Sequence, residues 1–205
     1  MFQIIAESIS KRYAGKYVFR DISLEARAPE VVCLVGPNGS GKTTLLKILC
    51  GLMRPTRGQV TVTRDNSDYP PARLRTTFGI QTPHVVLYDE LTVRENLEFV
   101  LTLRGGTYKN SQADALLERL SLTHKRDTAV AALSSGMKQK LTLIAAAAHT
   151  PEALFLDEPT SYVDRNGKEN VRALIEEWRA RALIIIATND PQEQEWGDRV
   201  IELGH

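Results

Sequence analysis

The stretch Gly36-Pro37-Asn38-Gly39-Ser40-Gly41-Lys42-Thr43 follows an apolar run, Val31 to Val35, and precedes a run, Thr44 to Cys50, that favours a helix. The order strand, G-x-x-x-x-G-K-T, helix is the context in which this motif binds phosphate. Glycines let the backbone direct N–H groups at phosphate oxygens, and the helix N-terminus adds the positive end of its dipole. The alternative, a glycine-rich turn that binds nothing, does not explain the Lys-Thr pair.

The end of the motif predicts a nucleotide ligand. A lysine at the position of Lys42 reaches the β and γ phosphates, and a hydroxyl at the position of Thr43 binds magnesium. We therefore expect the segment from Gly36 to Thr44 to bind a nucleoside triphosphate together with Mg²⁺.

The composition bounds the architecture and the partners. A chain of 205 residues is long enough for one α/β domain that buries roughly 70% of its unfolded surface. The net charge is +1, so no strong field attracts nucleic acid or an anionic membrane, and we expect no nucleic-acid partner.

The cysteines and the apolar runs indicate the compartment. Cys33 and Cys50 are interpreted as small buried residues in a reducing environment, without a disulfide or metal role. No apolar run has the length of a membrane span, and the start Met1-Phe2-Gln3 lacks a charged leader. We expect a cytoplasmic protein that reaches the inner face of the cell membrane only through a partner.

The order of expected elements predicts an α/β fold. Two strands, Phe2–Ile5 and Ile22–Ala26, are separated by the basic and aromatic segment Lys11–Tyr17. Further strands are expected over Val31–Val35, Gln59–Val62, Phe78–Ile80, Ala153–Leu156, Leu183–Ala187 and Val200–Leu203, with a surface loop over Asp65–Pro71. Helices are expected over Thr44–Cys50, Ala113–Leu120 and Met137–Ala148, from a capping box at Thr92 to Leu103, and over Arg165–Arg179 behind the cap Asp164.

A helical insertion is predicted inside this domain, because no strand pattern occurs between Gln81 and Ser134. We expect an α/β core over residues 1–81 and 150–205, with a helical subdomain over residues 82–149. Leu133-Ser134-Ser135-Gly136 begins the last helix of the insertion and is a second candidate anion site. Asp157 and Glu158 end a short apolar strand, and carboxylates there face the ligand crevice of a parallel sheet.

Four motifs in one order carry a family resemblance. The phosphate loop, Gln81, Leu133-Ser134-Ser135-Gly136 and Leu154-Phe155-Leu156-Asp157-Glu158-Pro159-Thr160 together resemble the ATP-binding subunit of ABC transporters. The resemblance covers nearly the whole chain and implies a P-loop NTPase core with a mixed sheet. It also implies antiparallel strands near the N-terminus and an inserted helical subdomain that carries the signature motif.

The resemblance assigns roles to single residues. Asp157 would hold magnesium with Thr43, and Glu158 would act as the general base toward water. Gln81 resembles the Q-loop glutamine, which senses magnesium and the γ-phosphate. Tyr13 matches the aromatic position that stacks on adenine, although a loop tyrosine is often only packed. Asp164 resembles the D-loop aspartate, in Ser161-Tyr162-Val163-Asp164 instead of Ser-Ala-Leu-Asp.

The resemblance also implies a dimer. Two chains, a second copy or a homologous ATPase, would pair head to tail and enclose two ATP molecules. Each nucleotide would contact the phosphate loop of one chain and Ser134, Ser135 and Gly136 of the other. ATP binding would close the dimer and hydrolysis would open it, and transmembrane permease subunits would follow this change.

The chain departs from the family pattern at two places. Ser135 and Met137 stand where glycine and glutamine are common, and Asn189 stands where a histidine contacts the γ-phosphate. An asparagine can donate a hydrogen bond but is shorter and carries no proton. We expect Lys42, Glu158, Gln81 and Asn189 to support hydrolysis, more slowly than with histidine. The alternative is that Asn189 only caps the following turn.

The transport role has several readings. The short chain and the pairing of Ser-Ser-Gly-Met with Thr-Asn-Asp look most like haem-exporter-type subunits of cytochrome c maturation. Leu87–Leu97 resembles the segment that contacts a transporter coupling helix, or is an ordinary amphipathic helix with its entry loop. Two alternatives stay open: an ATP-dependent clamp with little hydrolysis, and a non-transport ABC protein acting on nucleic acid or the ribosome.

Overall fold

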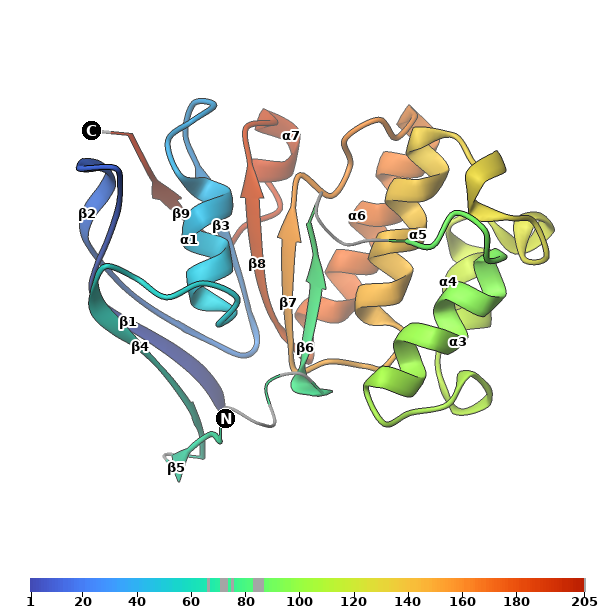
Figure 1. Ribbon diagram of the computed structural model, residues 1–205, viewed down its shortest axis with the longest axis horizontal. Coiled ribbons are helices and arrows are strands. Elements are labelled where there is room, and N and C mark those ends of the chain that lie inside the picture. The colour runs from blue at the N-terminus through green and yellow to red at the C-terminus, as the bar shows by residue number, and fades with distance from the viewer. Residues whose placement is uncertain (66, 71–73, 75, 83–86, 205) are drawn as a thin grey trace.

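Two sheets and a group of helices lie side by side in the computed structural model (Figure 1), which describes residues 1–65, 67–70, 74, 76–82 and 87–204. Within these residues, one sheet has four strands in the order β2-β1-β4-β5 and the other has five in the order β6-β7-β8-β3-β9. The predicted α/β class with antiparallel strands near the N-terminus is confirmed, and those antiparallel strands form a sheet of their own.

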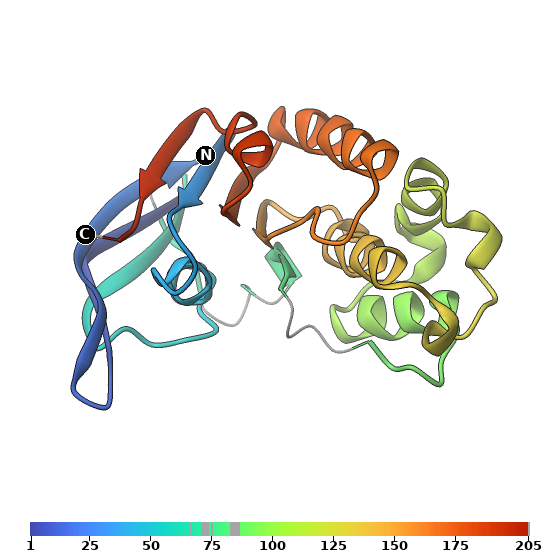
Figure 2. The ribbon, with the colours of Figure 1, turned by 90° about the horizontal axis from the view of Figure 1, so that it is seen from above.

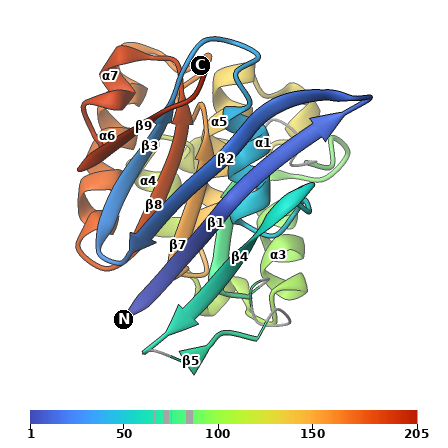
Figure 3. The same ribbon diagram turned by 90° about the vertical axis from the view of Figure 1, so that its left-hand side faces the viewer.

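The antiparallel sheet begins with a long hairpin, which crosses in front of α1 in Figure 3. Its strands are β1 (Phe2–Tyr13), β2 (Lys16–Arg27), β4 (Arg57–Arg64) and β5 (Ser67–Asp68). The prediction of Lys11–Tyr17 as a connection was wrong, because Lys11 pairs with Phe19 and Arg12 with Tyr17, leaving Ala14 and Gly15 to turn the chain. Cross-strand pairing stabilises this polar segment although its sequence does not alternate.

The prediction of a loop over Asp65–Pro71 was wrong for its middle part. There β5 pairs with β4, Asp68 with Thr63 and Ser67 with Arg64. Positions 66 and 71 of that prediction lie outside the described residues.

The five-stranded sheet is parallel and forms the centre of the domain. Its strands are β3 (Glu30–Val35), β6 (Phe78–Gln81), β7 (Ala153–Asp157), β8 (Leu183–Thr188) and β9 (Arg199–Glu202). Every residue of β7 and β8 is buried, as the continuous apolar runs predict for strands covered on both faces. The last strand begins and ends one residue earlier than predicted, because Arg199 already pairs with Val32.

Helices cover both faces of the parallel sheet (Figure 2). Helix α1 (Lys42–Leu49) packs between the two sheets in a cluster that includes Val32 and Leu34. Helices α5 (Ser135–Ala147) and α6 (Arg165–Arg179) pack on the opposite face in a cluster that includes Val31 and Cys33. The short helix α7 (Pro191–Gln194) follows β8. Neighbouring residues of β3 therefore point into different hydrophobic clusters.

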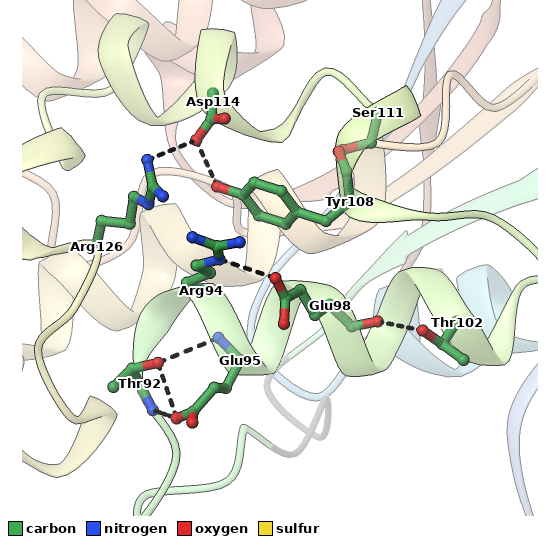
Figure 4. Close-up of polar contacts among 9 residues, drawn as sticks. All are labelled: Thr92, Arg94, Glu95, Glu98, Thr102, Tyr108, Ser111, Asp114 and Arg126. Carbon is green, nitrogen blue, oxygen red and sulfur yellow. Dashed lines mark hydrogen bonds and ion pairs between the residues drawn. The ribbon is translucent and has the colours of Figure 1, made fainter.

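Between β6 and β7 the described elements are helical. They are α3 (Val93–Leu103), η1 (Tyr108–Asn110), α4 (Ala113–Arg119), η2 (Thr123–Lys125), η3 (Val130–Ala132) and α5. Thr92 and Glu95 form the predicted capping box, with reciprocal hydrogen bonds between each side chain and the other residue's backbone N–H (Figure 4). Asp114 accepts a hydrogen bond from Tyr108 and pairs with Arg126, and these contacts join α4 to its neighbours (Figure 4).

Candidate nucleotide-binding and hydrolysis site

The phosphate loop emerges from the carboxyl end of β3 and turns at two glycines. Gly36 has φ 148°, and a Cβ there would lie 2.2 Å from the carbonyl oxygen of Leu203. Gly41 has φ 98° at the N-cap of α1, and a Cβ there would lie 2.6 Å from Val18. Positive φ and close neighbours explain why glycine occupies both positions.

The lysine of the loop is held by the loop itself. Lys42 is buried, and its Nζ donates hydrogen bonds to the carbonyl oxygens of Gly36 at 2.7 Å and Pro37 at 3.1 Å. Helix α1 begins at Lys42, so its first N–H groups, which have no intrahelical acceptors, face the loop. One positive side chain and a helix N-terminus thus meet at the place predicted for the nucleotide phosphates.

A carboxylate from the neighbouring strand faces the loop hydroxyl. Asp157 ends β7, and its Oδ1 accepts a hydrogen bond from Thr43 Oγ1 at 3.1 Å. Burial raises the pKa of Asp157, while the hydrogen bond from Thr43 opposes that rise. Its Oδ2 is buried and has no hydrogen-bond partner among the described residues. An unpaired buried carboxylate oxygen is costly, so this atom indicates a missing ligand.

Gln81 contacts the backbone of the same aspartate. It ends β6, and its Oε1 accepts a hydrogen bond from the backbone N–H of Asp157 at 3.2 Å. Its buried Nε2 and the buried hydroxyl of Ser40 also lack partners within the described part of the chain.

The donor set suits magnesium. Mg²⁺ binds one or two carboxylates together with nucleotide phosphates and water, and Asp157 Oδ2 beside the Thr43 hydroxyl provides the protein part of such a set. Clusters of three or more His, Cys, Asp or Glu that could hold a metal ion are absent from the described residues.

Glu158 follows directly and occupies an unusual backbone conformation. Its φ is 47°, its N–H donates to Ala187 O at 2.8 Å, and its carboxylate Oε2 accepts from Ser161 Oγ at 3.0 Å. A non-glycine residue in the left-handed region is uncommon and is held by its surroundings. Glu158 directly follows the end of β7 and so lies at the same end of the sheet as Asp157.

Asn189 lies beside the first turn of the phosphate loop. Its Nδ2 donates a hydrogen bond to Asn38 Oδ1 at 2.9 Å. The cap of the following helix is Asp190, whose carboxylate accepts from Gln192 N at 2.9 Å. The interpretation of Asn189 as a mere turn cap is therefore wrong. A hydrogen bond from Lys168 lowers the pKa of Asp190.

The signature segment is exposed at the start of α5. Ser134 is the N-cap, and its Oγ accepts a hydrogen bond from Met137 N at 3.3 Å, while Ser135 is also exposed. A Cβ on Gly136 would lie 2.4 Å from Tyr162 O, so the helix start packs directly on the turn after Glu158. Figure 1 places α5 and α1 on opposite sides of β6, β7 and β8. The signature segment and the phosphate loop of one chain therefore do not surround a common ligand.

Two predicted nucleotide contacts are at the periphery. Asp164 caps α6 by accepting from Gly167 N at 2.8 Å, and its carboxylate is exposed. Tyr13 is half exposed at the end of β1, with its hydroxyl donating to Met53 Sδ and Lys11 Nζ lying 5.0 Å from the ring centroid. Stacking of Tyr13 on adenine stays a prediction.

Sequence reasoning missed one buried carboxylate next to the site. Glu193 accepts hydrogen bonds from the backbone N–H and the hydroxyl of Thr160, two residues after Glu158. Burial raises the pKa of Glu193. It joins the turn after β7 to α7, which follows Asn189. A glutamate in a polar four-residue helix carries no sequence signal of burial, because its partner is distant along the chain.

The fold and the site define an ATP-binding P-loop protein, and comparison with known proteins identifies its family. The sequence profile described as ABC transporter matches residues 19–161. The chain is 32% identical over 191 residues to the lipopolysaccharide export system ATP-binding protein LptB of Haemophilus influenzae, covering 91% of this chain and 79% of that protein. The chain belongs to the ABC transporter family and is an ATP-binding domain of that family.

Other relatives are longer than this chain. It is 32% identical to ATP-binding cassette sub-family A member 2 of Rattus norvegicus, covering 98% of this chain but 8% of that protein. It is 31% identical to the sulfate/thiosulfate import ATP-binding protein CysA of Synechococcus elongatus, covering 98% of this chain and 60% of that protein.

A solved structure supports the fold. The dimeric post-hydrolysis state of the ATP-binding cassette MJ0796, bound to ADP and Pi, matches with a TM-score of 0.84 and 25% identity, covering 98% of this chain and 94% of that chain. Within the described residues, no helix combines the length and the apolar character needed to cross a membrane.

Proposed function

We propose that this chain hydrolyses ATP as the motor subunit of a transporter whose membrane-spanning part is separate. The observation that carries the proposal is the convergence of Lys42, Thr43, Asp157 and Glu158 at the carboxyl ends of β3 and β7, with Thr43 bonded directly to Asp157. Membership of the ABC family and the likeness to a cassette bound to ADP and Pi support it.

Each side chain has a task in hydrolysis. Lys42 would exchange its two carbonyl partners for β and γ phosphate oxygens, and Thr43, Asp157 and Gln81 would hold magnesium. When bound, magnesium neutralises charge on the phosphates. Glu158 would take a proton from the attacking water. The water oxygen would form a bond to the γ phosphorus, and the bond between the γ phosphorus and the oxygen that bridges to the β phosphate would break. ADP and phosphate are the products.

Asn189 would donate a hydrogen bond toward the γ-phosphate, and its present bond to Asn38 uses one of the two N–H donors of its amide. The asparagine side chain is shorter than that of histidine, has no titrating proton and is already hydrogen-bonded to Asn38. These properties support slow hydrolysis. An ATP-dependent clamp with little turnover is the second candidate function, and the hydrogen bond between Asn189 and Asn38 favours it.

The exposed signature segment supports a head-to-tail pair. Ser134, Ser135 and Gly136 lie at the exposed N-terminus of α5, where Ser134 Oγ caps the N–H of Met137, and Asp164 is the N-cap of α6. A second copy or a homologous ATPase would bring its own nucleotide to this helix. The MJ0796 cassette is described as dimeric, which agrees with such an arrangement.

Permease subunits would contact the helical part, which we assign to residues 82–149 against a core of residues 1–81 and 150–205. Tyr88 and Phe99 are exposed with ring centroids 5.0 Å apart, and Leu103 is 71% exposed. Tyr88 lies in the segment Leu87–Leu97 that resembles the coupling contact. These apolar side chains suit an amphipathic helix of a membrane protein, and the permease would keep this chain at the inner face of the membrane.

The cargo depends on the membrane subunits. Relatives of this chain are named for lipopolysaccharide export and for sulfate import, so a haem-exporter role stays a prediction. Co-purification of the chain with an integral membrane protein, lost in Leu103→Glu, is the expected result. Co-purification with nucleic acid instead would favour a non-transport ABC protein.

Steady-state ATP hydrolysis with Mg²⁺ tests the proposal. We expect turnover per chain to rise with protein concentration, because the complete site needs two chains. Glu158→Gln should lower turnover on the order of 100-fold while ATP still binds, and the exposed Glu169→Gln on α6 should leave turnover unchanged. Tight ATP binding without any turnover that depends on Glu158 would contradict hydrolysis and support the clamp.

A further inference from the structure

The backbone at Glu158 needs external support. A φ of 47° is uncommon for a residue with a side chain, and Glu158 has it at the point where the chain leaves β7. Its N–H is satisfied by Ala187 O of the neighbouring strand, at 2.8 Å. That contact fixes one side of the residue. The direction of the Glu158 carboxylate also depends on what holds the carbonyl side.

The carbonyl side is held by a side chain from α5. Gln139 Nε2 donates a hydrogen bond to Glu158 O at 2.7 Å, and this contact is partly buried. This side-chain amide, 19 positions away in sequence, restrains the peptide plane after Glu158 and therefore its ψ. Together with the N–H contact to Ala187 O, which restrains the preceding plane, it limits both φ and ψ. Ser161 Oγ then holds the carboxylate at 3.0 Å. Backbone and side chain of Glu158 are thus both restrained.

The same helix contacts this turn a second time. Gly136 lies so close to Tyr162 that a Cβ would approach its carbonyl oxygen to 2.4 Å. Gln139 comes three positions after Gly136, so both lie on one face of α5. The first turns of α5 therefore contact the segment from Glu158 to Tyr162 at both of its ends.

We propose that Gln139 is a positioning residue for Glu158, holding its left-handed backbone and so the direction of its carboxylate. This inference rests on the proposed function, in which Glu158 is the general base. Helix α5 starts at the serines that would meet the nucleotide of the partner chain. A displacement of α5 would lengthen the hydrogen bond from Gln139 to Glu158 O and so release Glu158. The Gln139 amide would thus couple the dimer contact at the start of α5 to the position of the general base.

Kinetics of the full chain test this role. Gln139→Leu removes the donor at similar volume, and we expect kcat to fall on the order of tenfold with KM for ATP changed less than about twofold. Gln59→Leu is the matched control, because the Gln59 amide also donates at 2.7 Å, to Glu7, but on β4 of the other sheet. It should keep the wild-type kcat.

A double-mutant cycle separates positioning from general damage. If Gln139 acts through Glu158, adding Gln139→Leu to Glu158→Gln will not slow single-turnover hydrolysis further. An equal fractional loss in both backgrounds would overturn the inference. If Gln139→Leu fails to fold, Gln139→Glu takes its place in the cycle, since it keeps the shape and loses the donor.

Failure of the proposed function and failure of the positioning role give different results. Turnover that survives Glu158→Gln contradicts the proposed function itself. Turnover that depends on Glu158 but is unchanged by both folded Gln139→Leu and folded Gln139→Glu contradicts only the positioning role.

Discussion

Asn189 donates a hydrogen bond to Asn38 across 151 positions of sequence, and so joins the turn after β8 to the phosphate loop. The bond keeps the amide close to the loop, and it uses one of the amide's two N–H donors. Replacement by histidine gives a longer side chain with a titrating ring nitrogen.

Asn189→His should therefore raise the ATP turnover number, on the order of tenfold. The control Asn170→His introduces the same side chain in the middle of α6 and should leave turnover unchanged. Steady-state phosphate release at saturating ATP measures both. An unchanged turnover number in Asn189→His would show that the asparagine does not limit hydrolysis.

Gly136→Ala tests how closely α5 packs on the turn after Glu158. Alanine normally stabilises a helix interior relative to glycine by roughly 0.5–1 kcal/mol. At this position the new Cβ would lie 2.4 Å from Tyr162 O, so we expect the sign to reverse, with a lower melting temperature and a lower turnover number. Gly106→Ala, where the nearest atom would lie at 3.5 Å, is the control and should cost less. A stabilised Gly136→Ala chain would contradict the close packing.

Asn96 tests the entry to α3. Its side chain is buried and satisfied on both sides, accepting from Tyr88 N at 2.8 Å and donating to Tyr88 O at 3.0 Å. Asn96→Ala leaves these backbone groups without partners, and we expect a loss of about 2–3 kcal/mol in the free energy of unfolding by urea denaturation. The exposed cap variant Thr92→Ala should cost about 1 kcal/mol. Equal losses of unfolding free energy in the two variants would show that the buried Asn96 contributes no more to stability than the cap Thr92.

His149 predicts a pH dependence of stability. It accepts a hydrogen bond from Arg104 at 3.0 Å, and burial together with the Arg104 charge lowers its pKa from 6.5 to about 4. The folded state therefore resists protonation, while the unfolded state takes a proton below pH 6.5. Stability from this group is present above pH 6.5 and falls as the pH decreases to about 4. Melting temperatures between pH 7 and pH 5 should drop further for the wild type than for His149→Gln, and parallel curves would refute this assignment.

Local sequence patterns predict most of the candidate site. A glycine-rich loop between an apolar strand and a helix, and two carboxylates at the end of another apolar strand, depend on neighbours in sequence. In the structure Lys42 hydrogen-bonds to Gly36 within the loop, and Thr43 hydrogen-bonds to Asp157. The capping box at Thr92 and the cap Asp164 were predictable for the same reason. Each is a short-range arrangement.

Contacts between distant segments were not predictable. The strands of the hairpin β1–β2 are longer than predicted. Lys11 and Tyr17 are polar or aromatic, and only cross-strand pairing makes them strand residues. Glu193 and Gln139 act on the turn around Glu158 from 33 and 19 positions away from their respective partners, through hydrogen bonds that no local pattern encodes. Long-range polar contacts leave little trace in a single sequence.

The alternation along β3 has a consequence for the loop that it carries. Val31 and Cys33 belong to the hydrophobic cluster under α5 and α6, whereas Val32 and Leu34 belong to the cluster around α1. The phosphate loop thus starts from a strand that is anchored twice, in two separate interiors. A substitution that loosens one of these clusters therefore leaves β3, and the loop that follows it, packed against the other.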